Sequence, residues 1–239
     1  MFRLFFTPTW FNGWDIIFEA VILVIALMIA AYSYRIFRLS KENNKFVYLS
    51  FAFVLIALGF LIKIAISAIL YFTPVRDAAL GVLAPVVIAS DSNLQFTNLF
   101  YRAGFFLQMA SILGGWLLIF FVSQKARKRL NKWHEVSQMA LFAYLILLIS
   151  VVSNFQYIVF YLTSAVLLSL IVLNYYKNYL NKDKNINAYL VMVSFLLVLI
   201  GNIFFIFVFL FANFYIVGEI LMLIGFLLLL YVYRRVVKK

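Results

Sequence analysis

Three charged residues stand inside apolar segments of this chain, where ionised side chains are rare. Lys63 lies in the unbroken run FLIKIAIS (60–67), and Glu19 and Glu219 lie in two other apolar segments far from it in the sequence. A charge in hydrocarbon costs about 2.5–3.5 kcal/mol on insertion scales, so such residues face a bundle interior and pair with one another. The residue types predict an ion pair, with Glu219 as the preferred partner of Lys63 and Glu19 as the second candidate.

The three charges fall at a similar depth if each apolar segment forms one helix. Counted at about 1.5 Å per residue from the basic residues that flank each segment, Lys63, Glu19 and Glu219 lie about 27, 28 and 22 Å from the same boundary. Two amides fall near the same level, and an arginine lies just above it. We expect one polar layer that serves as a ligand-binding site: Glu19, Lys63, Gln108, Asn202, Glu219 and Arg102.

Two interpretations of this layer stand side by side. In the first, the charges line an outward-facing polar pocket, and Lys63 lies within salt-bridge distance of an acid. In the second, Glu19 and Lys63 lie at the membrane interface, where a lysine extends its ammonium group to water and acids stay hydrated. Asp15 precedes Glu19 by four residues, so a helix would present both acids on one face.

The composition shows what must position these side chains. The 239 residues are 67% hydrophobic and 12% charged, with a mean hydropathy of +1.07. A soluble domain of this size could not bury that much apolar surface. About 20 apolar residues cross the hydrocarbon core as a helix. We predict an all-α integral membrane protein, a single domain over 1–239 without a soluble domain, with seven spans: 14–37, 46–73, 99–123, 137–153, 155–176, 187–211 and 214–233.

The basic residues predict the orientation. Sixteen of the twenty Lys and Arg fall in the first, third and fifth connections and in the C-terminal tail, whereas only Arg3, Arg76 and Arg102 fall on the other side. The positive-inside rule then places the N-terminus outside and the C-terminus in the cytoplasm. We expect a prokaryotic-type plasma-membrane protein whose partners are the lipid bilayer and, at the basic loop KARKRLNKWH (125–134), anionic lipid headgroups.

Two parts of the chain resemble each other. SKENNKFVYL (40–49) aligns without gaps with NKDKNINAYL (181–190), and GWLLIFFVSQK (115–125) resembles GFLLLLYVYRR (225–235). These matches favour a 3+1+3 arrangement of two parallel three-helix repeats, a plan that some transporters use. The alternative is that short basic connections in a chain rich in Lys and Asn look alike by chance.

Several kinds of chemistry are missing from the sequence. The chain has no cysteine and one histidine, His134, and it lacks the HExxH, GxSxG and P-loop motifs. We therefore expect no enzyme activity, no cofactor and no metal site. The net charge of +12 is explained by topology, so we expect no nucleic-acid partner.

The layout resembles that of the seven-helix membrane sensor modules found N-terminal to prokaryotic histidine kinases. The resemblance is carried by YRIFRL (34–39), ALGFLIK (57–63), a longer outer connection over 74–98, and GGWLLIFFVSQKARKR (114–129). It implies a sensor-like or ligand-binding module, and since no kinase is present, a separate signalling or complex partner. The alternatives are a small solute or ion transporter or channel built on the repeat, and a structural subunit of a membrane complex.

The cation asymmetry yields a topology prediction. An accessibility tag placed in the connection 124–135 and one placed at the C-terminus should both be protected in intact cells and labelled after permeabilisation. Labelling of either tag from outside intact cells would reverse the predicted orientation.

Overall fold

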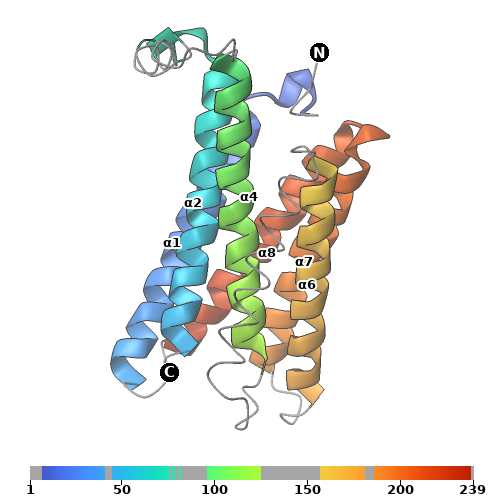
Figure 1. The fold of residues 1–239 in the computed structure, drawn as a ribbon. Helices are drawn as coiled ribbons and strands as arrows, with labels where there is room; N and C mark the ends of the chain where they lie inside the picture. The colour runs from blue at the N-terminus through green and yellow to red at the C-terminus, as the bar shows by residue number, and fades with distance from the viewer. Residues whose placement is uncertain are drawn as a thin grey trace.

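The computed structural model describes residues 7–40, 45–75, 77–78, 81, 96–124, 157–180 and 186–237. Six long helices dominate these ranges, and two short 3-10 turns, η1 (Thr9–Phe11) and η2 (Phe207–Phe209), accompany them (Figure 1). The long helices are α1 (Trp14–Ser40), α2 (Lys45–Tyr71), α4 (Phe96–Ser123), α6 (Tyr157–Leu180), α7 (Ile186–Ile206) and α8 (Asn213–Val237).

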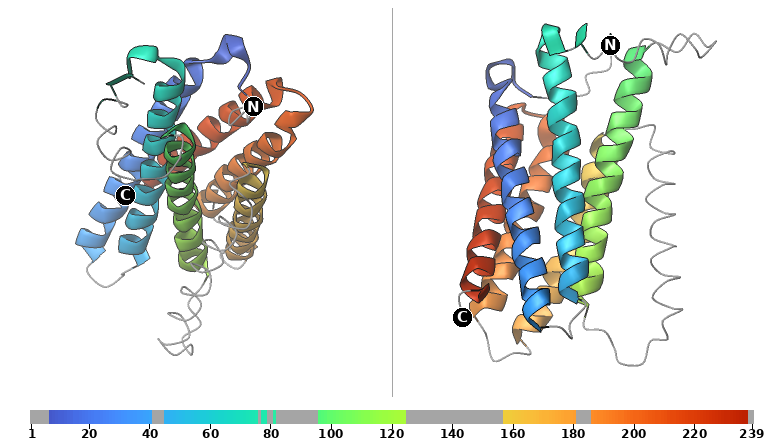
Figure 2. Two further views of the ribbon diagram at one scale, coloured as in Figure 1. Left: turned by 45° about the horizontal axis from the view of Figure 1, so that its top comes forward. Right: turned by 90° about the vertical axis from the view of Figure 1, so that its left-hand side faces the viewer.

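Each of the six helices packs mainly against its two neighbours in the chain order. α1 contacts α2, α2 contacts α4, α4 contacts α6, α6 contacts α7, α7 contacts α8, and α8 returns to α1. The six helices therefore form a closed ring, with α1, α2 and α4 on one side and α6, α7 and α8 on the other (Figures 1 and 2). Side chains that point to the middle of the ring are shielded from the surrounding medium.

The helix directions agree with an alternating path in each half. α4 and α6 run in the same direction, so Ser123 and Tyr157 lie at opposite ends of the bundle (Figures 1 and 2). The span predicted over 137–153 falls between them, outside the residues that the structure describes, as do the basic loop 125–134 and most of the outer connection 74–98. The other six predicted spans correspond to helices, with ends that differ by a few residues.

The outside of the ring is apolar. All six long helices have the length and hydropathy to cross a membrane. Large apolar side chains such as Val24, Leu61, Leu162 and Ile224 are about half exposed along their lengths. Because water would make such a surface costly, hydrocarbon is its natural solvent. The chain is a polytopic helical membrane protein.

Glycine lets α2 and α4 approach each other closely. A Cβ atom added at Gly115 would lie 2.5 Å from Cγ1 of Ile56 and 2.9 Å from the carbonyl oxygen of Ala52. On the facing helix, a Cβ added at Gly59 would collide with Ile112 and approach the carbonyl oxygen of Gln108. Small residues at such contacts bring helix backbones together, which is the main way that membrane helices gain packing energy.

The contact between α7 and α8 uses matching positions. A Cβ added at Gly225 would lie 2.7 Å from Cγ2 of Val198 and 2.9 Å from the carbonyl oxygen of Ser194, and one added at Gly201 would lie 3.4 Å from the nitrogen of Met222. The α2 residues 52, 56 and 59 therefore correspond to 194, 198 and 201, each 142 positions later. The α4 residues 108, 112 and 115 correspond to 218, 222 and 225, each 110 positions later.

Aromatic side chains fill the ring toward the end where the chain terminates. Trp116, two turns beyond Gln108 on α4, lies with its ring centroid 6.2 Å from that of Phe226 and 6.3 Å from that of Phe195. All three residues are buried. Pairs of this kind add about 0.5–1.5 kcal/mol beyond the area that they bury. This part of the interior is closely packed.

The glycine contacts generate a packing prediction with a matched control one residue away. Gly115→Ala should destabilise the protein by about 1–3 kcal/mol, because the new methyl group overlaps Ile56 and the Ala52 carbonyl. Gly114→Ala should be close to neutral, because only Leu55 lies within reach of its Cβ, at 3.7 Å. Unfolding of both variants in mixed detergent micelles measures the difference. Equal stabilities would contradict the close approach of α2 and α4.

Candidate functional site

Three helices bring one charged side chain each to the middle of the ring. The Lys63 Nζ atom of α2 lies 2.6 Å from Oε1 of Glu19 on α1 and 2.9 Å from Oε1 of Glu219 on α8. The second contact also has the geometry of a hydrogen bond, which the ammonium donates. The predicted pairing of Lys63 is present with both candidate acids at once. We call these three residues the ion cluster.

The ion cluster is buried. Glu19 and Glu219 are 0% exposed and Lys63 is 3% exposed. The sequence favoured a pair in a pocket open to the outside, or a lysine extended to the interface, and neither arrangement is found. The reason is the ring itself, because α1 packs against both α2 and α8 and closes over the charges. A buried pair of this kind needs both partners, since removal of one strands a charge.

Aromatic rings complete the surroundings of the ammonium group. Lys63 Nζ lies 5.4 Å from the ring centroid of Tyr215 and 5.8 Å from that of Phe205. Cations at this distance from a ring face are attracted by its quadrupole. The Tyr215 hydroxyl also donates a long hydrogen bond of 3.5 Å to Oε1 of Glu19. The cation is therefore held by two carboxylates and two rings.

Several buried polar atoms around the cluster lack a hydrogen-bond partner among the described residues. Oε2 of Glu19 and Oε2 of Glu219 are two of them, and Oε1 of Gln108 and the indole nitrogen of Trp116 are two more. A buried polar group without a partner costs about 1–3 kcal/mol. Unsatisfied groups of this kind in a native interior call for an explanation, such as an ordered water, an ion or a ligand.

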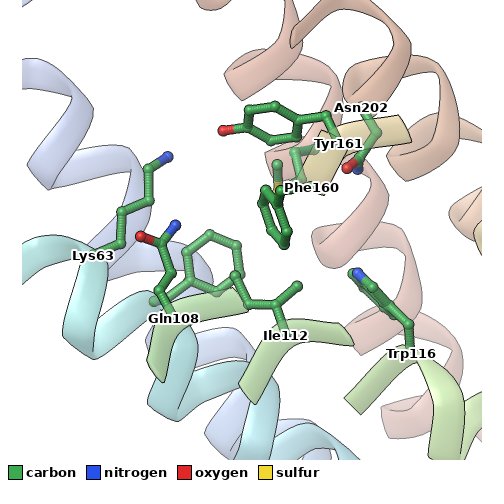
Figure 3. Close-up of a pocket in the computed structure, with 9 residues that line it drawn as sticks. Lys63, Gln108, Ile112, Trp116, Phe160, Tyr161 and Asn202 are labelled. Atoms are coloured by element: carbon green, nitrogen blue, oxygen red, sulfur yellow. The ribbon is translucent and has the colours of Figure 1, made fainter. Parts of the chain in front are cut away.

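A small cavity adjoins the ion cluster. It offers about 20 Å³ to the centres of water molecules, and about 10–15 Å³ is enough for one water. In Figure 3, Lys63 and Gln108 lie on one side of it and Tyr161 and Asn202 on the other. Its lining comes from both halves of the ring: Phe60, Lys63, Gln108, Ile112, Trp116, Phe160, Tyr161, Asn202 and Met222.

The remaining members of the predicted polar layer are divided between interior and surface. Gln108 and Asn202 are buried and line the cavity. The Asn202 amide donates to the Val198 carbonyl of its own helix, at 2.9 Å, so one of its donors is already used. Arg102 is exposed and does not belong to the site.

Asp15 does not join Glu19 in a shared acid site. Its carboxylate accepts a 2.8 Å hydrogen bond from the Tyr71 hydroxyl at the end of α2 and another of 2.8 Å from the backbone N–H of Gly13. Gly13 has a φ of 93°, a conformation that glycine adopts at little cost. Asp15 thus fastens the start of α1 to the end of α2, one turn above the ion cluster.

Sequence reasoning missed the aromatic members of the site. Tyr215 precedes Glu219 by four residues, which puts both on one face of α8. Tyr161 stacks on Phe205, with ring centroids 4.8 Å apart. The i, i+4 spacing was the available signal for Tyr215, but in a chain with 47 aromatic residues (28 Phe, 15 Tyr and 4 Trp) it does not stand out.

No group of three or more His, Cys, Asp or Glu side chains suited to a metal occurs among the described residues. The two carboxylates that do meet share a lysine instead. Comparison of the chain with protein-family models, curated proteins and solved structures gave no match. The functional argument therefore depends on the geometry of the site.

The ion cluster yields a stability prediction. Lys63→Met should cost about 3–5 kcal/mol, because it leaves two buried acids without their cation. Lys63→Met combined with Glu219→Gln should recover part of that loss, since one stranded acid is gone. Lys45→Met, at an exposed lysine of the same helix, is the matched control and should change stability by less than about 0.5 kcal/mol. If Lys63→Met proves as harmless as the control, the ion cluster does not hold the bundle together.

Proposed function

We propose that the chain is a sensor-like, ligand-binding membrane module whose site is the polar interior around Lys63. The observation that carries this proposal is the ion cluster, because it joins α1 and α2 of one half to α8 of the other. A ligand that competes for one of its partners changes the contact between the halves. Ionisable residues inside a bundle are a functional hypothesis by default.

The unsatisfied atoms indicate the class of ligand. Three of the four are carbonyl or carboxylate oxygens: Oε2 of Glu19, Oε2 of Glu219 and Oε1 of Gln108. Acceptors of this kind bind a cation or a hydrogen-bond donor. A small amine or another cationic solute therefore fits the site better than an anion does. Since the cavity has room only for water, binding of a larger solute requires the two halves to separate.

The lack of an output domain assigns the rest of the pathway to a partner. A sensor of this size would transmit its state to a separate signalling or complex subunit through its helices. Rigid-body movement of one half against the other is a familiar means of such transmission. The basic connections on the side predicted to be cytoplasmic would hold that surface against anionic lipid headgroups.

A transporter is the second candidate, and the matching glycine contacts favour it. The register that relates α2 to α7 also relates α1 to α6, since Glu19 and Lys63 correspond to Tyr161 and Phe205, 142 positions later. The first pair forms a salt bridge and the second a ring stack. The helix register exceeds by one the offset of 141 between the aligned connections that start at 40 and 181. Parallel repeats with a site between them are one transporter plan.

A ligand screen tests the first proposal. The purified protein in lipid nanodiscs is heated in the presence of small amines, neutral polar solutes and carboxylates. A cationic solute at about 100 times its Kd should add about 2.7 kcal/mol of stability. Gln108→Leu and Glu219→Gln should lose that shift, and Lys45→Met should keep it. A shift of equal size in all variants would place binding elsewhere.

Flux separates the two candidates. Proteoliposomes that contain the wild-type protein should bind the solute identified in the screen without accumulating it if the chain is a sensor. Time-dependent uptake that exceeds binding, and that Glu219→Gln abolishes, would favour the transporter.

A further inference from the structure

The ion cluster has one more acid than base. Its single cation, Lys63, faces two carboxyl groups, and no arginine or second lysine lies among the buried residues that the structure describes. If both acids were ionised, the interior would hold a net charge of −1. An uncompensated charge buried away from water costs several kcal/mol after relaxation. The interior is therefore one positive charge short.

The geometry brings the two carboxyl groups close together. Both Oε1 atoms contact the same nitrogen, at 2.6 and 2.9 Å, so they cannot be farther apart than the two distances combined. Two acids that share one site do not both ionise readily. Both Oε2 atoms are buried and unpartnered among the described residues. An added proton would find a free oxygen on either acid.

Gln108 supplies an independent sign of a missing donor. Its side chain is 1% exposed, lines the cavity beside Lys63, and extends toward that lysine (Figure 3). Its Oε1 atom has no hydrogen-bond partner in the described part of the chain. An O–H group on a carboxyl, directly or through a water in the adjoining cavity, is a donor of the kind this oxygen lacks.

We propose that the ion cluster binds one proton, shared between the carboxyl groups of Glu19 and Glu219. Protonation converts one carboxylate and a free proton into a neutral carboxyl group, so that the cluster, with its ammonium and its remaining carboxylate, has no net charge. The proton belongs to the pair of acids as a unit. A metal ion is a poorer occupant, because the described residues offer no group of three or more acidic or His ligands.

The other titratable groups near the cluster do not supply the missing charge. Asp15 on α1 is engaged by Tyr71 of α2 and by a backbone N–H. α6 presents Tyr161 and Tyr157, and α8 presents Tyr215, all of which are neutral as phenols. α4 and α7 face the cluster with Gln108 and Phe205. None of these side chains is a cation.

Infrared spectroscopy of the protein in bilayers counts the proton directly. At neutral pH the wild-type protein should show one carbonyl band of a buried protonated carboxyl group. Glu219→Gln and Glu19→Gln should each lose that band, because a single acid paired with Lys63 is neutral without a proton. Lys63→Met should show about twice the intensity, since both acids then need one. Asp15→Asn is the control and should keep the wild-type band.

The pH dependence of stability gives a second readout. Carboxyl groups of the unfolded chain are ionised at neutral pH, so the folded protein binds one more proton, and its stability falls as the pH rises. This slope should be present in the wild type and absent in Glu219→Gln. The proposal is overturned if the wild type has no protonated carboxyl band, or if the band survives in both glutamine variants. It does not depend on the proposed ligand, since a ligand screen can fail while the band is present.

Discussion

The ammonium group of Lys63 between the carboxylates of Glu19 and Glu219 is the constraint on which the interior depends. None of the three side chains has access to water in the structure, and each would be costly in hydrocarbon alone. Their mutual contact fixes the rotation of α1, α2 and α8, because a helix turned away would withdraw its charge from the other two. The ring closes at the α1–α8 contact, beside these residues.

Close packing makes that arrangement durable. Glycine contacts bind α2 to α4 and α7 to α8, so each half behaves as a compact unit. The ion cluster and the aromatic contact between Trp116 and Phe226 then join the halves at two depths. A structure built of two tight halves and a polar contact between them has a natural place for movement. Its polar contact is also the place where a bound proton or solute changes the energy of that movement.

Depth along a helix could be predicted from the sequence, and rotation about the helix could not. The fixed rise per residue placed Glu19, Lys63 and Glu219 at a common level, and the structure joins them. Arg102 was assigned to the same layer, yet it precedes Gln108 by six residues, which turns it about 240° from that face at about 100° per residue.

The closure of the site and its aromatic wall also escaped prediction. Whether α1 would pack against α8 and seal the cluster depends on contacts between segments about 200 residues apart in the chain, which no local pattern encodes. Tyr215 and Phe205 look like ordinary apolar positions until Lys63 is placed between them. The repeat was suggested by the loops, whereas its register within the helices becomes visible only through the glycine contacts.

The most direct test of the account is a solid-state NMR measurement of the dipolar coupling between ¹⁵Nζ of lysine and ¹³Cδ of glutamate in the protein reconstituted in lipid. Two glutamate carbons should be dephased by Lys63, and Glu219→Gln should reduce them to one while Lys63→Met removes both. If no glutamate carbon of the wild-type protein is coupled to a lysine nitrogen, the ion cluster does not exist and the proposed site is lost with it.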